Sequence, residues 1–343
     1  MARTSGTTER QSDVEQHSNT GRQSANSERQ PSNFEQEPQN RRPPTPEFQS
    51  ETTEFEQPAN ADQWSASASD LSIIAHRGFA GVYPENTIGA VKQATAAPTG
   101  APEMIEIDVH PTADGEVVVF HDTRLDRLTD ASETLASQRV WNLSYEDMRN
   151  VSILGSDETI PRLETFLDAV PSEIGVNVEF KNPGTLDVRP RENLPPEDRE
   201  KQKELWRPFA ERVLSTLADY DNEFLISSFG EGALAAVREL DSNIPIAAVF
   251  AESIVDGFEI ARRYDCDAIH PPWNMVSGTE LFNDEYGSLG PYDEIDIVDL
   301  AHAEGYEVNV WTVESWYQAT QLHEAGVDGI IADYPNVLRF SGR

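Results

Sequence analysis

The chain has 343 residues and a formal net charge of −35, from 26 Lys and Arg against 61 Asp and Glu. Nucleic acid is excluded as a partner, because phosphate backbones bind basic patches. The single cysteine, Cys266, excludes an internal disulfide framework. The sequence has no apolar run of about 18 residues, the length that a membrane-spanning helix needs. We therefore predict a soluble, cytoplasmic protein without a transmembrane segment.

The N-terminal region differs in composition from the rest of the chain. It is rich in Ser, Gln, Asn, Glu and Pro and has few aliphatic residues. Such a segment buries too little apolar surface to offset the conformational entropy that is lost on ordering. We predict a disordered polar tail over residues 1–69 and one folded domain over residues 70–343.

The predicted domain is strongly acidic and poor in lysine. Residues 1–68 contain six Arg and eleven acidic residues, a net −5, so the remainder carries −30 of the total charge. The whole chain contains only four lysines. This composition is typical of a high-salt cytoplasm, where ions screen the self-repulsion of an acidic surface. It predicts a halophilic protein of haloarchaeal type, and the alternative is an ordinary acidic protein.

From Asp70 onward, short apolar runs alternate with stretches of helical periodicity. The predicted strands are residues 72–75, 104–109, 117–120, 176–180, 224–227, 245–250, 268–270, 307–311 and 329–332. The predicted helices are residues 88–97, 143–148, 163–169, 197–218, 231–240, 253–264, 294–304 and 314–325. The first helix has Asn86 or Thr87 as a plausible N-cap.

The order of these elements predicts the fold. Asp114-Gly115 is typical of a hairpin turn, so the strand at 117–120 returns antiparallel to the one before it. The other eight strands are nearly all separated by helices, which indicates parallel βαβ units. Eight units in this length predict a (β/α)8 TIM barrel with a small hairpin and insert after strand 2. The alternative is an open doubly wound sheet, although the usual glycine-rich nucleotide-binding motifs are absent.

The stretch from Ile73 to Asp126 holds most of the predicted site. In a TIM barrel the chemistry lies at the carboxyl ends of the strands. The polar and aromatic residues at those ends are His76, Arg77, Glu106, Asp108, Glu179, Lys181, Ser227, Ser228, His270 and Trp311, and His121 joins them through the hairpin.

Three of these residues predict a metal site. Glu106 and Asp108 are two residues apart on one strand, so both side chains lie on the same face. Two neighbouring carboxylates repel each other, and a divalent cation removes that repulsion. Oxygen ligands suit Mg²⁺ or Ca²⁺ better than zinc. Glu179, on the next strand, is the predicted third ligand.

The remaining residues predict acid–base chemistry on a phosphate. His76 and His121 are candidates for the general acid and base, because histidine titrates near neutral pH. Arg77 and Lys181 are candidates to bind a phosphate. Trp311 either walls the substrate pocket or packs the top of the barrel. The alternatives for the histidines and for Arg77 are structural roles, in the latter case a salt bridge across the rim.

Several segments together resemble the glycerophosphodiester phosphodiesterase family, over roughly Ile73 to Asn336. They are IAHRGFAGVYPENTIGAV, IEIDVHPTADGEVVVFHDTRLDRLT, IPRLETFLDAV, VNVEFK, ISSFG and GVDGIIADYP. The resemblance implies a TIM barrel that hydrolyses glycerophosphodiesters to an alcohol and sn-glycerol 3-phosphate with a divalent cation. It implies the same roles for the seven charged candidates: His76 and His121 for acid and base, Glu106, Asp108 and Glu179 for the metal, Arg77 and Lys181 for the phosphate.

Some features leave the identity of the substrate undecided. Glu314 follows the WTV segment where the family often has an Asn, which puts a substrate contact there in doubt. The short insert between His121 and Ile160 need not form an elaborate cap. A lysophospholipase D acting on lipid is the main alternative, kept open by apolar residues near the predicted mouth: Phe79, Val82, Tyr83 and Trp273. A non-catalytic phosphodiester-binding barrel is the second alternative, and the sequence leaves the head group, the cation and the oligomeric state open.

Overall fold

The computed structural model describes residues 71–96, 101–286 and 290–338, and the predicted tail over residues 1–69 lies outside them. The described strands are β1 (Ser72–His76), β2 (Met104–Pro111), β3 (Val117–Val119), β4 (Gly175–Phe180), β5 (Phe224–Ser228), β6 (Ile246–Val249), β7 (Ala268–His270), β8 (Glu307–Val313) and β9 (Gly329–Ala332).

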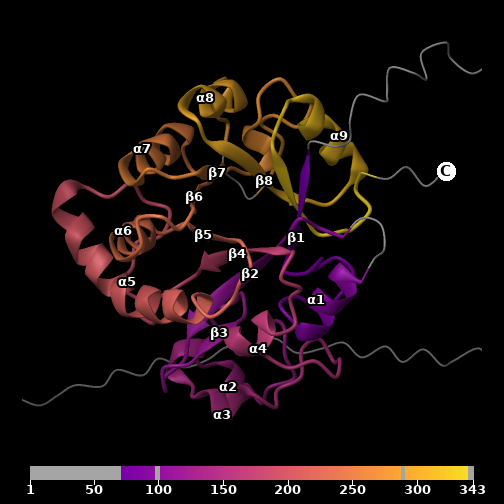
Figure 1. The fold of residues 1–343 in the computed structure, drawn as a ribbon, viewed down its shortest axis with the longest axis vertical. Coiled ribbons are helices and arrows are strands. Elements are labelled where there is room, and N and C mark those ends of the chain that lie inside the picture. The colour runs from indigo at the N-terminus through magenta and orange to yellow at the C-terminus, as the bar shows by residue number, and fades with distance from the viewer. Residues whose placement is uncertain (1–70, 97–100, 287–289, 339–343) are drawn as a thin grey trace, which may run out of the picture. The chain divides into compact units, whose positions relative to one another are not determined.

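The strands close into a barrel. The sheet runs in the order β1-β9-β8-β7-β6-β5-β4-β2-β3, and β1 also pairs with β2. All pairs are parallel except the pair of β2 with β3, which is antiparallel. The predicted TIM barrel of eight parallel strands is confirmed, and β3 forms the predicted hairpin on its outside (Figure 1).

The helices are α1 (Ile88–Thr95), α2 (Glu133–Ala136), α3 (Tyr145–Met148), α4 (Leu163–Leu167), α5 (Pro196–Leu217), α6 (Glu231–Leu240), α7 (Ile254–Tyr264), α8 (Ile297–Glu304) and α9 (Trp316–Glu324), with 3-10 turns η2 (Val140–Asn142) and η3 (Trp273–Met275). Figure 1 shows α1 and α5 to α9 arranged around the strands. The main hydrophobic core lies between these helices and the outer face of the barrel.

The two faces of the strands differ in polarity. On β2, Ile105, Ile107 and Val109 belong to the main core, whereas Glu106 and Asp108 alternate with them and point to the other face. A small apolar cluster of Leu225, Ala247 and Ala268, with Met104 packed on it, lies apart from the main core. Because these residues share the inner face with the polar ones, the barrel interior is apolar towards its amino end and polar towards its carboxyl end.

Most predicted helices are confirmed, and the differences have local causes. Thr87, not Asn86, caps α1: its hydroxyl accepts a hydrogen bond from Ala90 N at 3.0 Å. Helix α8 begins at Ile297 because the Asp296 side chain accepts from Asp299 N and fixes the first turn there. The predicted helix over 143–148 is confined to α3, and the sequence did not predict the short helix α2.

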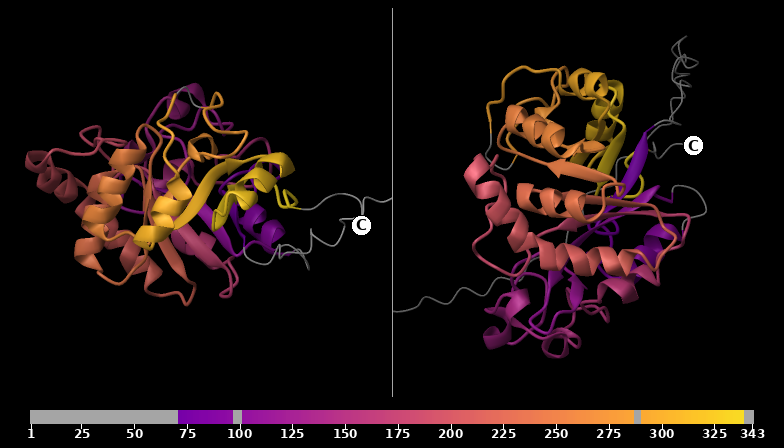
Figure 2. Two further views of the ribbon diagram at one scale, coloured as in Figure 1. Left: turned by 90° about the horizontal axis from the view of Figure 1, so that it is seen from above. Right: turned by 60° about the vertical axis from the view of Figure 1, so that its left-hand side comes forward.

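The insert, residues 121–160, has a small hydrophobic core of its own. Its buried side chains pack with two from the hairpin, and the cluster consists of Val118, Phe120, Leu125, Leu128, Val140, Leu143, Met148, Ile153 and Ile160. Figures 1 and 2 show α2 and α3 beside β3, away from α7 and α8. The insert is therefore a compact addition to one side of the barrel.

Candidate active site

The register of three neighbouring strands brings the predicted metal ligands together. Glu106 on β2 pairs with His76 on β1, and Asp108 on β2 pairs with Glu179 on β4. Paired residues of adjacent strands place their side chains on the same face. Each of the three carboxylates offers one oxygen atom, and these three atoms lie within 4.8 Å of one another. The predicted cluster of Glu106, Asp108 and Glu179 is thus assembled at the carboxyl end of the barrel.

The cluster fits a hard divalent cation. Glu106 and Asp108 are almost fully buried, and Glu106 Oε1 accepts no hydrogen bond from the described residues. Burial, together with the nearby charges of Asp108 and Glu179, raises the pKa of Glu106 well above its ordinary value. A buried carboxylate oxygen without a donor, beside two further carboxylates, is the arrangement that Mg²⁺ or Ca²⁺ relieves.

Two cations contact the same cluster. Lys181 Nζ lies 2.6 Å from Glu179 Oε1 and 3.2 Å from Asp108 Oδ1, and Arg77 Nε lies 3.2 Å from Asp108 Oδ2. Burial alone would raise the pKa of Asp108, but Lys181 and Arg77 hold it well below its ordinary value. Asp108 is therefore an ionised carboxylate, and the two predicted phosphate-binding residues both border the predicted metal site.

The first predicted catalytic histidine is held by an aspartate that the sequence did not single out. His76 Nδ1 lies 2.6 Å from Asp333 Oδ1, and His76 Nε2 lies 3.9 Å from Glu106 Oε2. Burial lowers the pKa of His76, with a further contribution from Arg77, while the bond with Asp333 opposes them. With Nδ1 bound to Asp333, the Nε2 atom faces the carboxylate cluster.

The second predicted catalytic histidine has a similar arrangement. His121 Nδ1 lies 2.6 Å from Asp122 Oδ1. Burial alone would raise the pKa of Asp122, but its bonds with His121 and Arg127 lower it below its ordinary value. Arg127 in turn donates two hydrogen bonds to Asp122 and two to Glu85. Each histidine therefore has a carboxylate at Nδ1, the arrangement that fixes ring orientation and tautomer.

The loop between β1 and α1 holds its polar residues in an unusual backbone conformation. Arg77, Phe79 and Asn86 have φ values of 51°, 67° and 59°, in the left-handed region that non-glycine residues rarely adopt. Gly78 has φ 77°, and a Cβ there would lie 2.9 Å from Ala90 Cβ. This conformation turns Asn86 inward, where its Nδ2 donates to Asp108 Oδ2 at 2.8 Å. Such strain is typical of functional loops.

Aromatic rings occupy the other side of the barrel mouth. Trp311 on β8 packs edge-on against Phe229 at 5.6 Å and lies 5.9 Å from Tyr286, which lies 4.8 Å from Trp273. Trp311 Nε1 donates to His270 O at 2.8 Å. The loop between β4 and α5 also reaches this cluster, since the guanidinium of Arg191 lies 4.8 Å over the Phe229 ring. Trp311 thus both packs the barrel top and keeps a partly exposed face.

Other histidines and polar residues have structural surroundings. His270 is buried beside Asn309, and burial lowers its pKa to about 3. His110 is buried against Trp141, its Nε2 lies 3.2 Å from His121 O, and burial lowers its pKa to about 4. Asn177 is buried below Glu179 with both side-chain polar atoms unpaired among the described residues. The two histidines are therefore neutral at pH 7, and His110 contacts the backbone of His121.

Sequence reasoning missed four contributors: Asp333, Asp122, Asn86 as a partner of Asp108, and Arg127. Asp122 follows His121 directly, so the His-Asp dipeptide was an available signal. Asp333 lies 257 residues from His76 and becomes its neighbour only because β9 pairs with β1 and closes the barrel. No local pattern in the sequence carries that information.

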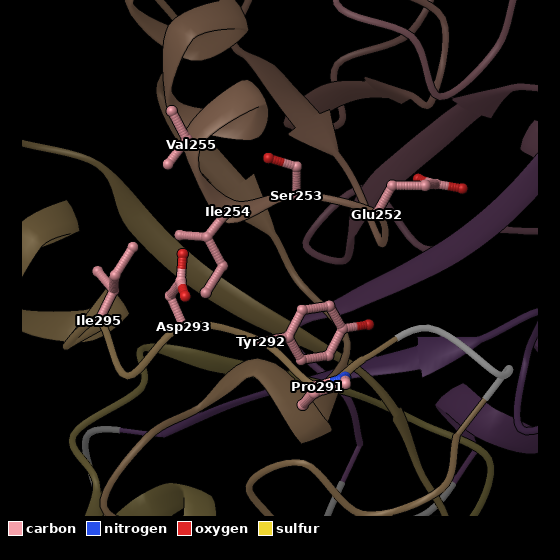
Figure 3. A pocket seen from close by; sticks show the side chains of 8 residues that line it. All are labelled: Glu252, Ser253, Ile254, Val255, Pro291, Tyr292, Asp293 and Ile295. Atoms are coloured by element: carbon pink, nitrogen blue, oxygen red, sulfur yellow. The ribbon is translucent and has the colours of Figure 1, made fainter.

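A separate cavity of about 150 Å³ lies at the start of α7 (Figure 3). None of the predicted site residues lines it. Its walls include Glu252 and Asp293 but no basic residue or histidine. This cavity therefore offers no positive charge that would attract a phosphodiester, in contrast to the carboxylate cluster with Arg77 and Lys181. No helix in the described part of the chain is both long and apolar enough to cross a bilayer.

Comparisons with known proteins show what the chain is similar to. A family model described as the glycerophosphoryl diester phosphodiesterase family matches residues 76–337. The chain is 29% identical over 277 residues to a glycerophosphodiester phosphodiesterase of Bacillus altitudinis, covering 77% of this chain and 95% of that protein. It is 24% identical over 281 residues to a lysophospholipase D of Mus musculus, covering 78% and 84%. An Oleispira antarctica phosphodiesterase, solved with the product sn-glycerol-3-phosphate, superimposes with a TM-score of 0.59 at 24% identity, covering 77% and 93%.

Proposed function

Because the chain belongs to the glycerophosphoryl diester phosphodiesterase family, we propose that it hydrolyses glycerophosphodiesters to an alcohol and sn-glycerol 3-phosphate. The chain is a phosphodiesterase by family and by its named relatives. The observation that carries the finer proposal is the close approach of three carboxylates to two cations and two carboxylate-bound histidines at the barrel mouth. The solved relative with sn-glycerol-3-phosphate supports a small-molecule substrate.

The proposed roles follow from the contacts. Arg77 and Lys181 bind the phosphate, since both are cations at the edge of the carboxylate cluster. One of His76 and His121 takes a proton at Nε2 from the attacking hydroxyl, and the other gives a proton to the leaving oxygen. The attacking group is either water or the glycerol 2-hydroxyl, and the second route passes through a cyclic phosphate. Asp333 and Asp122 keep the two rings oriented.

Glu106, Asp108 and Glu179 are proposed to hold the divalent cation, Mg²⁺ or Ca²⁺. The support is the buried, donor-free Glu106 Oε1 and the short separation of the three ligand oxygens. When bound, the cation neutralises the non-bridging phosphate oxygens as charge develops. The cation and the two-histidine mechanism are both parts of the proposal.

A lysophospholipase D is the second candidate function. One relative carries that name, and Val82 and Tyr334, on the loops after β1 and β9, are 51% and 40% exposed. Two of the four apolar residues that kept this alternative open are buried, namely Phe79 and Trp273. The exposed apolar surface at the mouth is thus smaller than the sequence suggested, which favours a small, water-soluble diester.

The test is a substrate panel. Glycerophosphocholine, glycerophosphoethanolamine and lysophosphatidylcholine are assayed with added Mg²⁺ or Ca²⁺ and with EDTA. We expect turnover of the two soluble diesters and its loss with EDTA. Turnover of the lysolipid alone establishes the second candidate, turnover that EDTA does not change rejects the metal site, and no turnover of any diester rejects the activity. Running the panel in low and high KCl tests the proposed halophilic character, which predicts higher activity and stability at high salt.

A further inference from the structure

The insert has a hydrophobic core but no role in the proposed reaction beyond supplying His121. One of its side chains, Arg127, lies between Asp122 of the insert and Glu85 of the loop between β1 and α1. Arg127 Nε lies 2.6 Å from Asp122 Oδ2, and its Nη2 lies 2.8 Å from Asp122 Oδ1. On its other side, Nη1 lies 3.1 Å from Glu85 Oε2 and Nη2 lies 3.0 Å from Glu85 Oε1. One guanidinium thus makes a two-point contact with each of two carboxylates.

Each of those carboxylates holds a proposed functional residue. Asp122 Oδ1 binds His121 Nδ1 at 2.6 Å, and Glu85 Oε1 accepts from Arg77 Nη1 at 2.8 Å. A continuous chain of hydrogen bonds therefore runs from His121 through Asp122, Arg127 and Glu85 to Arg77. Its two ends are an acid–base group and a phosphate-binding group.

The insert fixes the position of Arg127. Leu125 and Leu128, on either side of it in sequence, are fully buried in the core of the insert. The insert also contacts helix α1, because Glu158 Oε2 accepts a hydrogen bond from Gly89 N at 3.0 Å. Arg127 is consequently held by packing on one side and by four hydrogen bonds on the other.

The arrangement favours a geometric role over a stabilising one. The Arg127 side chain is 48% exposed, and exposed ion pairs contribute little to folding stability. A planar guanidinium that makes two bonds to each carboxylate nevertheless sets their mutual distance and orientation.

We propose that Arg127 is a positioning residue that couples His121 to Arg77. Through Arg127, the insert fixes the distance and orientation of the acid–base group relative to the phosphate-binding group. This inference rests on the proposed function for its kinetic consequences. Lysine cannot replace Arg127, because a single ammonium cannot make two-point contacts with two carboxylates at once.

The chain provides a matched control. Arg124 lies three residues before Arg127 in the insert, is exposed, and has no side-chain hydrogen bond or ion pair with any described residue. The full-length variants Arg127→Met, Arg127→Lys, Arg124→Met, Asp122→Asn and Asp122→Asn/Arg127→Met are compared with the unchanged chain. Methionine keeps an unbranched apolar stem and removes the fork.

The measurements are kcat and KM for glycerophosphocholine, thermal unfolding, and the ¹⁵N spectrum of the histidine rings. We expect kcat/KM to fall about 10–100-fold in Arg127→Met and nearly as much in Arg127→Lys, with Tm unchanged. Arg124→Met should match the unchanged chain. The double variant should be no worse than the poorer single variant, since both break one chain of contacts. The Nδ1–H signal of His121 should weaken in Arg127→Met and in both variants that carry Asp122→Asn, because Asp122 is its direct partner, and should be unchanged in Arg124→Met.

Three results would overturn the coupling: Arg127→Met with the activity of Arg124→Met, effects of Asp122→Asn and Arg127→Met that multiply independently, or an unchanged His121 signal in Arg127→Met. Failure of the proposed function is recognised separately, because the unchanged chain would then hydrolyse none of the diesters. The His121 signal still decides the coupling in that case, since it needs no substrate.

Discussion

The barrel mouth has two halves of different character. The ends of β9, β1, β2 and β4, which are consecutive in the sheet, carry the carboxylates, the cations and His76, and the insert adds His121. We name this the charged half. The ends of β5 to β8 carry the aromatic cluster of Phe229, Trp273, Tyr286 and Trp311, which we name the aromatic half. Seven of the eight predicted site residues lie in the charged half, and Trp311 lies in the aromatic half.

The two halves differ in how their buried polar groups are held. In the charged half, buried ionised groups such as Asp108 are kept in place by direct partners, and each partner has a partner of its own. In the aromatic half, His270 and Asn309 are buried and neutral, and ring contacts fill the space. We therefore expect changes in the charged half to reduce the chemical step, and changes in the aromatic half to affect substrate fit or stability.

The largest expected effect is the loss of either histidine that we propose as general acid or base. His76→Ala or His121→Ala should lower kcat by roughly 10²–10⁴, the usual contribution of general acid–base catalysis. Thermal unfolding should stay close to that of the unchanged chain, because both side chains lie at the partly exposed mouth. The matched control is His302→Gln, an exposed histidine paired with Asp328. Full activity in either alanine variant would remove that histidine from the mechanism.

The next largest effect concerns the proposed cation. A ligand that binds only the folded state stabilises it, by about 2.7 kcal/mol at 100 times its Kd. Mg²⁺ or Ca²⁺ should therefore raise the Tm of the unchanged chain, and Glu106→Gln should abolish that rise because a proposed ligand is lost. Differential scanning fluorimetry with EDTA and with each cation measures this, and Glu173→Gln, at an exposed glutamate, is the control. An equal rise in Glu106→Gln would show that the cation binds elsewhere.

The fold was largely predictable because its signals are local. The eight parallel strands follow from apolar runs and helical periodicity, and Asp114-Gly115 marks the hairpin. The insert was harder, since helices of four residues such as α2 have too few positions to show a period. Its core depends on side chains that are far apart in the sequence, such as Phe120 and Ile160, and packing of that kind has no repeating pattern in the sequence.

The site was predictable where residues lie two apart on a strand or beside one another, as with Glu106 and Asp108. It was not predictable where barrel closure or the insert supplies the partner. Asp333 reaches His76 through strand closure, and Arg127 reaches Glu85 through the packing of the insert. The aspartate and arginine that orient the site therefore had to come from the structure.

Asp333 gives a smaller expected effect than the histidine it holds. In Asp333→Asn the amide cannot balance charge on the ring and can hold the wrong tautomer of His76. We expect kcat to fall roughly 10-fold, well short of the loss in His76→Ala, with KM little changed. Asp328→Asn alters a similar aspartate–histidine pair, with His302, and should leave kcat unchanged. A wild-type kcat in Asp333→Asn would show that His76 needs no partner.

In the aromatic half, Trp311→Phe should act on substrate fit alone. The variant keeps a ring beside Phe229 but loses the hydrogen bond from Nε1 to His270 O. Without this internal bond, which contributes about 0.5–1.5 kcal/mol, the ring is held less firmly at the barrel mouth, so we expect KM to rise roughly 2–10-fold while kcat stays within about twofold. Steady-state kinetics with glycerophosphocholine separates the two constants. A loss confined to kcat would show that Trp311 contributes to the chemical step, and the two halves would then not differ in function as we expect.

The smallest effect on activity, and the sharpest contrast with the catalytic histidines, is expected for His270→Gln. At neutral pH the activity should change less than twofold, since His270 is buried and, among the described residues, its ring hydrogen-bonds to Asn309 alone. Burial lowers its pKa to about 3 from an ordinary value of 6.5. Between these values the unfolded chain binds a proton that the folded chain does not, so this histidine weakens the fold as pH falls below 6.5.

The variant His270→Gln should remove this loss of folding stability at low pH. Above pH 6.5 both proteins have the same protonation at this position, and below it the unfolding free energy of the unchanged chain should fall more steeply, by about 1.4 kcal/mol per pH unit. Urea unfolding from pH 7 to pH 5 compares the two slopes, and acidic groups common to both proteins cancel in the difference. Identical slopes would mean that His270 becomes charged within the folded barrel, and the aromatic half would then hold a charge as the charged half does.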